Sequence, residues 1–199
     1  MGIAGGTGDV QIILLAGFAG LLAGSFSMAS GEYVSMGAQR DMFEHQMELE
    51  RVEIEEFPEE EKRELALIYM TKGLTKEEAD KVANRLFGDV EVALDTKLRE
   101  EMGLSRSQFG SPWAATISSF VAFTVGALVP LISFFILEDN AAIVTSALLS
   151  AFALAVVGGV MSSLGGKSSL WGGIRMLLIG TTAAAVTFSI GSLIGITLD

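Results

Sequence analysis

The chain has 199 residues, of which 50% are hydrophobic and 19% are charged, and its formal net charge is −11 at pH 7. It contains no cysteine and one histidine, which excludes disulfide frameworks, cysteine-ligated zinc, iron–sulfur clusters and thiol catalysis. The negative charge repels nucleic acid and suits cations or a basic partner, so we expect no nucleic-acid partner.

The charges are confined to one segment of the chain. Residues 40–106 hold eleven of the 13 Lys and Arg residues and nineteen of the 24 acidic residues. The flanking regions are therefore almost free of charge, as in segments that lie in lipid, whereas the middle segment has the composition of a protein surface in water.

Four apolar stretches are long enough to span a membrane. About 20 consecutive apolar residues, each rising about 1.5 Å, cross a hydrocarbon core about 30 Å thick. The alternative, a soluble protein with four buried helices, is disfavoured because soluble helices keep a polar stripe. The first stretch lacks the basic flank of a signal peptide, since no Lys or Arg precedes Arg40, so we expect it to be retained. The four charge-free stretches are Val10–Ala29, Ala114–Leu137, Ala141–Leu164 and Met176–Leu198.

The basic residues predict an orientation. Lys and Arg in short flanks stay in the cytoplasm, and here they lie between the first and second stretches and, as Lys167 and Arg175, between the third and fourth. The predicted fold is therefore an all-α polytopic membrane protein with four transmembrane helices and a cytoplasmic amphipathic helical domain inserted after the first. Its predicted segments are 1–39 (first membrane helix), 40–110 (Glu-rich domain) and 111–199 (three membrane helices).

Small residues four positions apart in the membrane stretches favour close helix packing. Gly20 and Gly24 form one such pair, and Gly191 and Gly195 form another. Pro130 lies inside the second stretch, where we expect it to bend the helix.

The charged segment has the pattern of short amphipathic helices, with apolar residues returning at helical spacing. Thr75 and Glu78 have the spacing of a capping box, which opens a helix. Pro58 interrupts the first acidic run, because its ring removes a helical hydrogen bond and restricts the preceding residue. The predicted helices cover about 40–57, 59–72, 75–88 and 89–103.

Two pairs of glutamates flank Pro58. Glu50 and Glu53 precede it and Glu61 and Glu64 follow it, and a spacing of three places each pair on one helix face. The two faces can meet across the bend, and cations that neutralise them would relieve their repulsion. Without cysteine, such a set suits manganese, ferrous iron, calcium or magnesium. The alternative is a solvated acidic face, which is our interpretation of Glu55, Glu56, Glu59 and Glu60.

Two further residues lie near the end of the first membrane stretch. An ionisable group costs about 2.5–3.5 kcal/mol at mid-membrane and is retained mostly for function. Glu32 is such a group if it lies at depth, or it reaches headgroup water if the helix continues. Met28, one turn earlier, offers a soft thioether ligand or plain packing. His45 forms no Glu-x-x-His motif of a di-metal oxidase, so we expect an exposed residue there and no enzyme.

The run Ala23–Ser35 resembles the signature of the second membrane helix of the vacuolar iron transporter family, and the resemblance continues through Pro130–Leu131 and Gly173–Met176. The family carries ferrous iron and manganese out of the cytoplasm. The resemblance implies a homodimer in a lipid bilayer, a path between protomers, transport driven by proton exchange, and a cytoplasmic domain that collects metal on glutamates.

The resemblance also assigns residues. Met28 matches the pore methionine, Glu101 matches a fifth glutamate at the end of the cytoplasmic domain, and Glu32 becomes a proton or metal carrier. Four glutamates match the family's metal-binding set with the same intervals. The predicted metal residues, for Fe²⁺ or Mn²⁺ as cargo and with no resident cofactor, are Met28, Glu32, Glu50, Glu53, Glu61, Glu64 and Glu101.

The sequence also departs from the family pattern. Residues 1–6 look like the tail of the family's first membrane helix, whose acidic residues are absent, so we expect either a misplaced start or a reduced protein. Gly20 stands where some members have a pore glutamate, and Lys97 and Leu98 replace two methionines.

Two hypotheses result: a divalent-metal transporter, or a transport-incompetent membrane protein that binds metal or a partner through its acidic domain. The expected location is the cell membrane in a prokaryote and a vacuolar or other endomembrane in a eukaryote.

Overall fold

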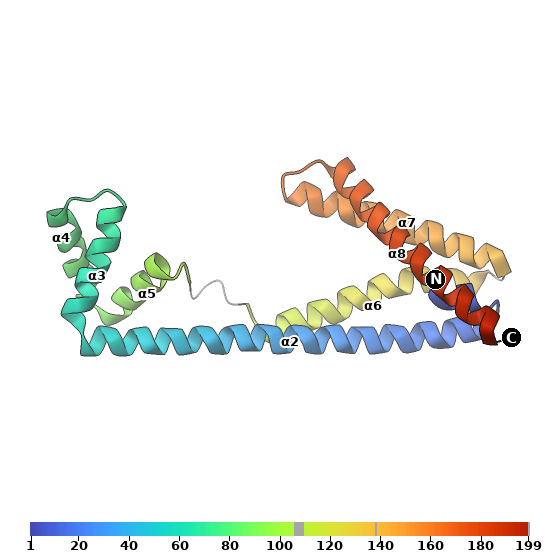
Figure 1. Cartoon of the computed structure of the whole chain (residues 1–199), viewed down its shortest axis with the longest axis horizontal. Helices are drawn as coiled ribbons and strands as arrows, with labels where there is room; N and C mark the ends of the chain where they lie inside the picture. Colours follow the sequence, from blue (N-terminus) through green and yellow to red (C-terminus); the bar gives the residue numbers. More distant parts are fainter. Residues whose placement is uncertain (106–109, 138, 199) are drawn as a thin grey trace. The chain divides into compact units, whose positions relative to one another are not determined.

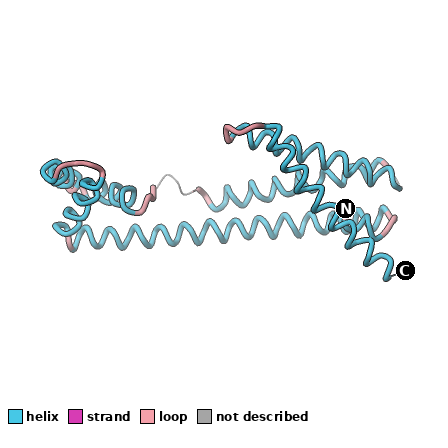
Figure 2. Tube along the Cα trace, turned by 45° about the horizontal axis from the view of Figure 1, so that its top comes forward, coloured by secondary structure: helices cyan, strands magenta, loops and turns pink. Residues whose placement is uncertain are grey.

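The computed structural model describes residues 1–105, 110–137 and 139–198. Within this described part every regular element is a helix, and short loops join the helices (Figure 2). The predicted all-α fold is confirmed. The helices are α1 (Gly2–Gly6), α2 (Val10–Glu56), α3 (Pro58–Thr71), α4 (Lys76–Leu86), α5 (Val90–Glu101), α6 (Pro112–Ile136), α7 (Asp139–Leu164) and α8 (Ser169–Leu198).

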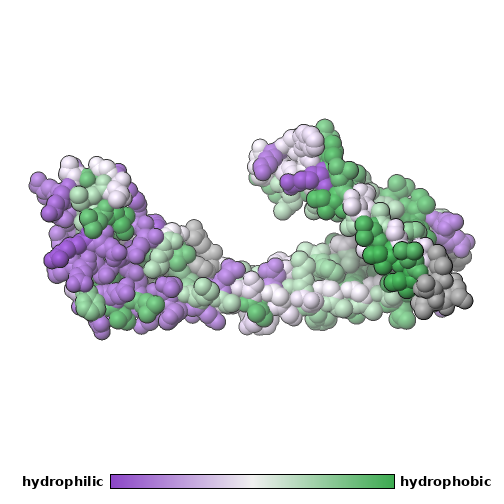
Figure 3. Space-filling view, in the orientation of Figure 1, coloured by the Kyte–Doolittle hydropathy of each residue, from purple (hydrophilic) through white to green (hydrophobic). Residues whose placement is uncertain are grey.

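The chain divides into two compact units. The membrane unit comprises Met1–Ala29 and Ile117–Asp199, and the acidic unit comprises Ser30–Thr116. Hydrophilic residues gather over the acidic unit and hydrophobic residues cover much of the membrane unit (Figure 3).

Four helices among the described residues are long and apolar enough to cross a membrane, namely α2, α6, α7 and α8. Their apolar side chains face outward: Phe152 is 70% exposed and Leu164 is 80% exposed. A protein surface in water does not carry so much continuous apolar area, so this surface is suited to a lipid bilayer. The four predicted membrane helices are thus confirmed, although α8 begins at Ser169 rather than at Met176 and includes Arg175.

Helix α2 is 47 residues long and passes from the membrane unit into the acidic unit. The sequence predicted a separate helix from residue 40, but the structure has no break there, because no proline lies between Val10 and Glu56 and isolated glycines cost a helix only about 1 kcal/mol each. The helix ends before Phe57, whose φ of −127° and ψ of 50° reflect the exclusion of α-helical geometry before Pro58.

The predicted packing of Gly191 and Gly195 is confirmed, and the partner is the short helix α1. A Cβ added to Gly191 would strike the carbonyl of Gly2, and one added to Gly195 would strike the carbonyl of Gly6. Two glycine pairs at a spacing of four thus face each other, which lets the two backbones touch. Residues 1–6, which in the sequence look like the tail of a membrane helix, are helical over Gly2–Gly6.

Other glycines in the membrane unit differ in the space around them. Gly24 packs beneath the ring of Phe123, whereas Gly20 has open space around it. In α7 and α8, Gly158 and Gly172 each lie against the other's carbonyl. The predicted close packing therefore holds for Gly24 and not for Gly20, since nothing among the described residues reaches it.

In the acidic unit, α3, α4 and α5 pack at the C-terminal end of α2 (Figure 1). The predicted capping box is present, since Glu78 Oε2 accepts from the Thr75 backbone N–H at 2.9 Å and Thr75 Oγ1 accepts from the Glu78 N–H at 3.4 Å. Two apolar clusters form the core. One contains Phe43, Ile54, Ala93, Leu94 and Leu98, and the other contains Leu65, Ala66, Ala79 and Ala83.

We predict that Gly158→Ala destabilises the protein. The new Cβ would lie 2.5 Å from the Gly172 carbonyl oxygen and 2.6 Å from the Met176 Cβ, so α7 and α8 must separate. Overpacking of this kind costs about 1–3 kcal/mol. Thermal melting of the detergent-purified chain should show a lower midpoint for this variant.

The matched control is Gly126→Ala in α6, where an added Cβ meets nothing within 4 Å. Its melting temperature should equal or exceed that of the unmodified chain, because alanine favours a helix more than glycine does. Equal melting temperatures for the two variants would contradict the close α7–α8 contact.

Candidate metal site

The predicted glutamates converge from three helices of the acidic unit. Glu50 and Glu53 lie on α2, Glu61 and Glu64 on α3, and Glu101 at the end of α5. The turn at Pro58 folds α3 back, so that one carboxylate oxygen from each of Glu50, Glu53 and Glu61 lies within 4.8 Å of the others. The structure therefore brings glutamates from the two sides of the proline together. We call the five glutamates the carboxylate cluster.

A lysine occupies the centre of the carboxylate cluster. The Lys97 Nζ lies 2.7 Å from Glu64 Oε2, 3.1 Å from Glu101 Oε2 and 3.2 Å from Glu50 Oε1, and it also donates to Glu61. The Lys97 side chain is only 1% exposed. One ammonium thus links α2, α3 and α5.

Burial is graded across the carboxylate cluster. The side chain of Glu50 is 2% exposed and that of Glu61 is 11% exposed, whereas Glu101 is 34% and Glu64 50% exposed. Glu53 is also exposed. The cluster therefore has a closed inner side at Glu50 and an outer side open to water.

Lys97 and Glu50 are the two most buried charged groups of the cluster, and burial and ion pairing act in opposite directions on the pKa of each. Burial disfavours the charged ammonium of Lys97, but hydrogen bonds to the glutamates and the charge of Glu50 outweigh it, so the pKa of Lys97 is raised and the group stays protonated. Burial also raises the pKa of Glu50, an effect that Lys97 opposes only in part. The Glu50 Oε1 lies near the ammonium but forms no hydrogen bond with any described residue.

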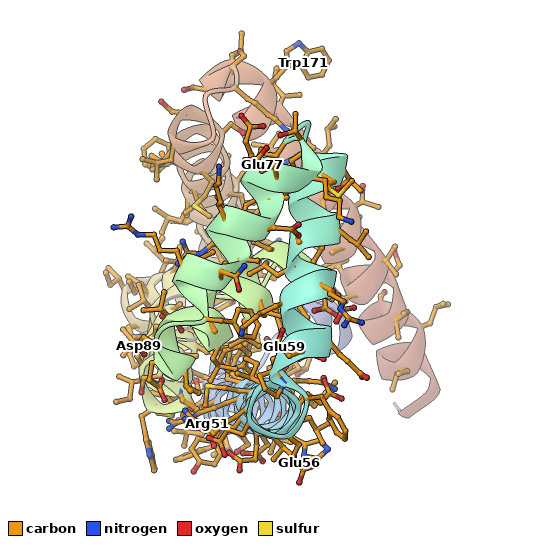
Figure 4. All side chains as sticks on the ribbon, turned by 90° about the vertical axis from the view of Figure 1, so that its left-hand side faces the viewer. Arg51, Glu56, Glu59, Glu77, Asp89 and Trp171 are labelled. Carbon is orange, nitrogen blue, oxygen red and sulfur yellow. The ribbon has the colours of Figure 1, made fainter. Side chains whose placement is uncertain are left out.

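The remaining acidic residues near the bend are solvated, as predicted. Glu55, Glu56, Glu59 and Glu60 are all exposed. Glu56 and Glu59 lie on the outside of the α2–α3 junction, and Glu59 pairs with Lys62 at 2.7 Å (Figure 4). On another side of the unit, Arg51 of α2 pairs with Glu91 of α5 at 2.6 Å.

In the sequence Lys97 stands out only as a replacement for a thioether, and its position at the centre of the cluster was not predicted. The signal was available, because Ala93, Leu94, Lys97 and Leu98 have the spacing of one buried helix face. A lysine on such a face needs carboxylate partners, since lysine is almost never fully buried unless paired.

Met28 and Glu32 are not part of the carboxylate cluster. They lie one turn apart on one face of α2, and Glu32 precedes Glu50 by eighteen positions, about 27 Å along a straight helix at 1.5 Å per residue. Met28 is 47% exposed and Glu32 is partly buried. His45 is exposed, as expected.

One polar contact inside the membrane unit was not predicted. The hydroxyl of Ser25, which is fully buried, lies 2.9 Å from the hydroxyl of Thr124, so the two groups share a hydrogen bond between α2 and α6. Neither hydroxyl is left unpaired in the apolar interior.

Four membrane helices together with a separate unit of converging carboxylates define a multi-pass α-helical membrane protein with an acidic domain in water. More particularly, the chain belongs to the VIT family, whose sequence profile matches residues 1–192. The predicted family is thereby confirmed.

Relatives of the chain bear transporter names. A vacuolar iron transporter of Acanthamoeba castellanii is 37% identical over 182 residues, which cover 91% of this chain and 69% of the relative. Vacuolar iron transporter 1 of Arabidopsis thaliana is 27% identical over 194 residues, which cover 97% and 78% of the two chains. A vacuolar iron transporter of Centaurea cyanus is 28% identical over 188 residues, covering 94% and 77%.

Proposed function

We propose that the chain is a divalent-metal transporter that moves ferrous iron, manganese or both out of the cytoplasm in exchange for protons. The observation that carries the proposal is the presence, in one chain of the VIT family, of four membrane helices and a carboxylate cluster drawn from three helices. Relatives named vacuolar iron transporters support the choice of iron and of a vacuolar or other endomembrane. In a prokaryote the same protein would lie in the cell membrane.

In this proposal the carboxylate cluster collects the ion from the cytoplasm. Bonds of about 2.0–2.6 Å from a hard divalent cation to oxygen place opposite ligands about 4–5 Å apart. The oxygens of Glu50, Glu53 and Glu61, which lie within 4.8 Å of one another, suit that span. Glu64 and Glu101 lie on the open side of the set, where an arriving ion meets them first. Oxygen ligands without cysteine favour manganese and ferrous iron over softer metals.

The membrane path in this proposal uses Met28 and Glu32. They share one face of α2, so that a thioether and a carboxylate follow each other along the helix. Met28 is 47% exposed in the single chain, which leaves it available at an interface between two protomers. We place the path in a homodimer for this reason. The Lys and Arg residues of the acidic unit favour its location in the cytoplasm.

A second function is a membrane protein that binds metal or a partner through its acidic unit without transporting an ion. The observation that favours it is Lys97, because a buried ammonium already neutralises part of the cluster. The absence of uptake by the intact chain, together with retained metal binding, would support this alternative.

We expect Met28→Ala to reduce uptake of Mn²⁺ and Fe²⁺ into proteoliposomes by about tenfold or more, since the loss even of a group that only orients a metal ligand typically costs about 10–100-fold. The control is Met42→Ala, which changes the same residue type on the same helix at a position that is 70% exposed and belongs to the acidic unit. Uptake measured with radiolabelled ions should be unchanged in the control. Equal uptake by both variants would remove Met28 from the path.

We expect Glu53→Gln to weaken Mn²⁺ binding to the detergent-purified chain by about tenfold or more in titration calorimetry, because a ligand charge is lost. Among the described residues Lys97 pairs with the other four glutamates but not with Glu53, so this variant leaves the ion pairs of the lysine intact. Glu55→Gln, an exposed change two positions along α2, should bind as the unmodified chain does. Equal affinities in the two variants would show that Glu53 is not a ligand.

A further inference from the structure

The ammonium of Lys97 has the surroundings of a bound ion. Carboxylates from three helices converge on it, with Glu64, Glu101 and Glu50 oxygens at 2.7, 3.1 and 3.2 Å and Glu61 also in contact. Its side chain is 1% exposed. Lys97 therefore forms ion pairs with the same carboxylates that a divalent ion would need as ligands.

We propose that Lys97 is a built-in cation that competes with divalent metal for the carboxylate cluster, so that the acidic unit assembles without metal and an ion binds only by displacing the lysine. The inference deepens the proposed function, on which it rests, by naming the residue that sets how readily the cluster takes its ion. Lys97 controls the affinity of the cluster for its ion and is not itself a ligand.

The cluster keeps the means to attract an ion while Lys97 is in place. Four carboxylates face one ammonium, so three negative charges remain uncompensated around it. The Glu50 Oε1 is buried and accepts no hydrogen bond from any described residue, although it faces the ammonium. That oxygen has an ion-pair partner at 3.2 Å but no well-aligned hydrogen bond within the described part of the chain, so a metal–oxygen bond could replace its contact with the ammonium.

The graded burial provides a route for displacement. Glu64 and Glu101 are the outer partners of Lys97, 50% and 34% exposed, and the flexible four-carbon stem of lysine can move the ammonium toward them and into water. That movement leaves the oxygens of Glu50, Glu53 and Glu61 facing one another within 4.8 Å. Glu50, Glu53 and Glu61 then hold the ion while Glu64 and Glu101 retain the lysine.

The proposal is tested on the full detergent-purified chain with Lys97→Met, which replaces the ammonium with an unbranched, uncharged side chain of similar length. Mn²⁺ affinity is measured by competition with a fluorescent chelator. We expect the variant to bind Mn²⁺ at least about tenfold more tightly. The coupling free energy of a close charge pair exceeds the free energy that corresponds to a tenfold change in affinity. The matched control is Lys81→Met, which removes an exposed lysine of α4, and its affinity should not change. An unchanged or weaker affinity of Lys97→Met overturns the proposal.

Melting temperatures give a second readout. Its decisive result is that of the unmodified chain, so it holds even if the variant is unstable. The unmodified chain should melt at the same temperature with EDTA as without it, because its cation is covalently attached. Lys97→Met should melt lower in EDTA and recover in Mn²⁺. An unmodified chain that loses stability in EDTA overturns the proposal, whatever the variant does.

These measurements are independent of transport. If the unmodified chain fails to take up metal into proteoliposomes, the proposed transport function fails, but the affinity and melting results still decide the role of Lys97. If uptake is present and Lys97→Met gains no affinity, only the inference about Lys97 fails.

Discussion

The acidic unit depends on the balance between one buried ammonium and the carboxylates around it. Two like charges 4.8 Å apart repel by about 3–4 kcal/mol at an effective dielectric constant of about 20, and Glu50, Glu53 and Glu61 place oxygens within that distance. Such repulsion at several pairs would rival the stability of a whole domain, typically about 5–15 kcal/mol. A cation among these carboxylates relieves the repulsion, and Lys97 supplies one from within the chain.

Few breaks interrupt the helices that carry the carboxylate cluster. Helix α2 carries Glu50 and Glu53 without interruption from the membrane unit, and the single residue Phe57 separates it from α3. Because Pro58 fixes where the first helix ends, the two glutamate pairs meet at a position set by covalent geometry as well as by charge. In the membrane unit glycine fixes the packing instead, since the α1–α8 and α7–α8 contacts are made by backbones that touch.

The features that the sequence predicted are those with a local cause. Length and apolarity predict the membrane helices, Pro58 predicts the bend, and Thr75 with Glu78 predicts a helix start, because each depends on neighbouring residues alone. The carboxylate faces were also predicted, from a spacing of three. The position of Lys97 was not, because it depends on packing between helices that are distant in the sequence. The continuity of α2 was missed for a related reason: a change from apolar to charged composition marks a change of solvent and not the end of a helix.

Under the proposed function, the charge count explains how one cluster could hold a lysine and still take a divalent cargo. Five carboxylates and one ammonium carry four net negative charges, and an ion of charge +2 lowers this to two if the lysine stays at the outer edge. Binding then relieves repulsion without expelling the lysine from the cluster, because Glu64 and Glu101 retain it where water lowers the cost of its charge. In the proposed function the site takes up an ion and releases it to a path, and a lysine held at the outer edge can return to the inner carboxylates when the ion leaves.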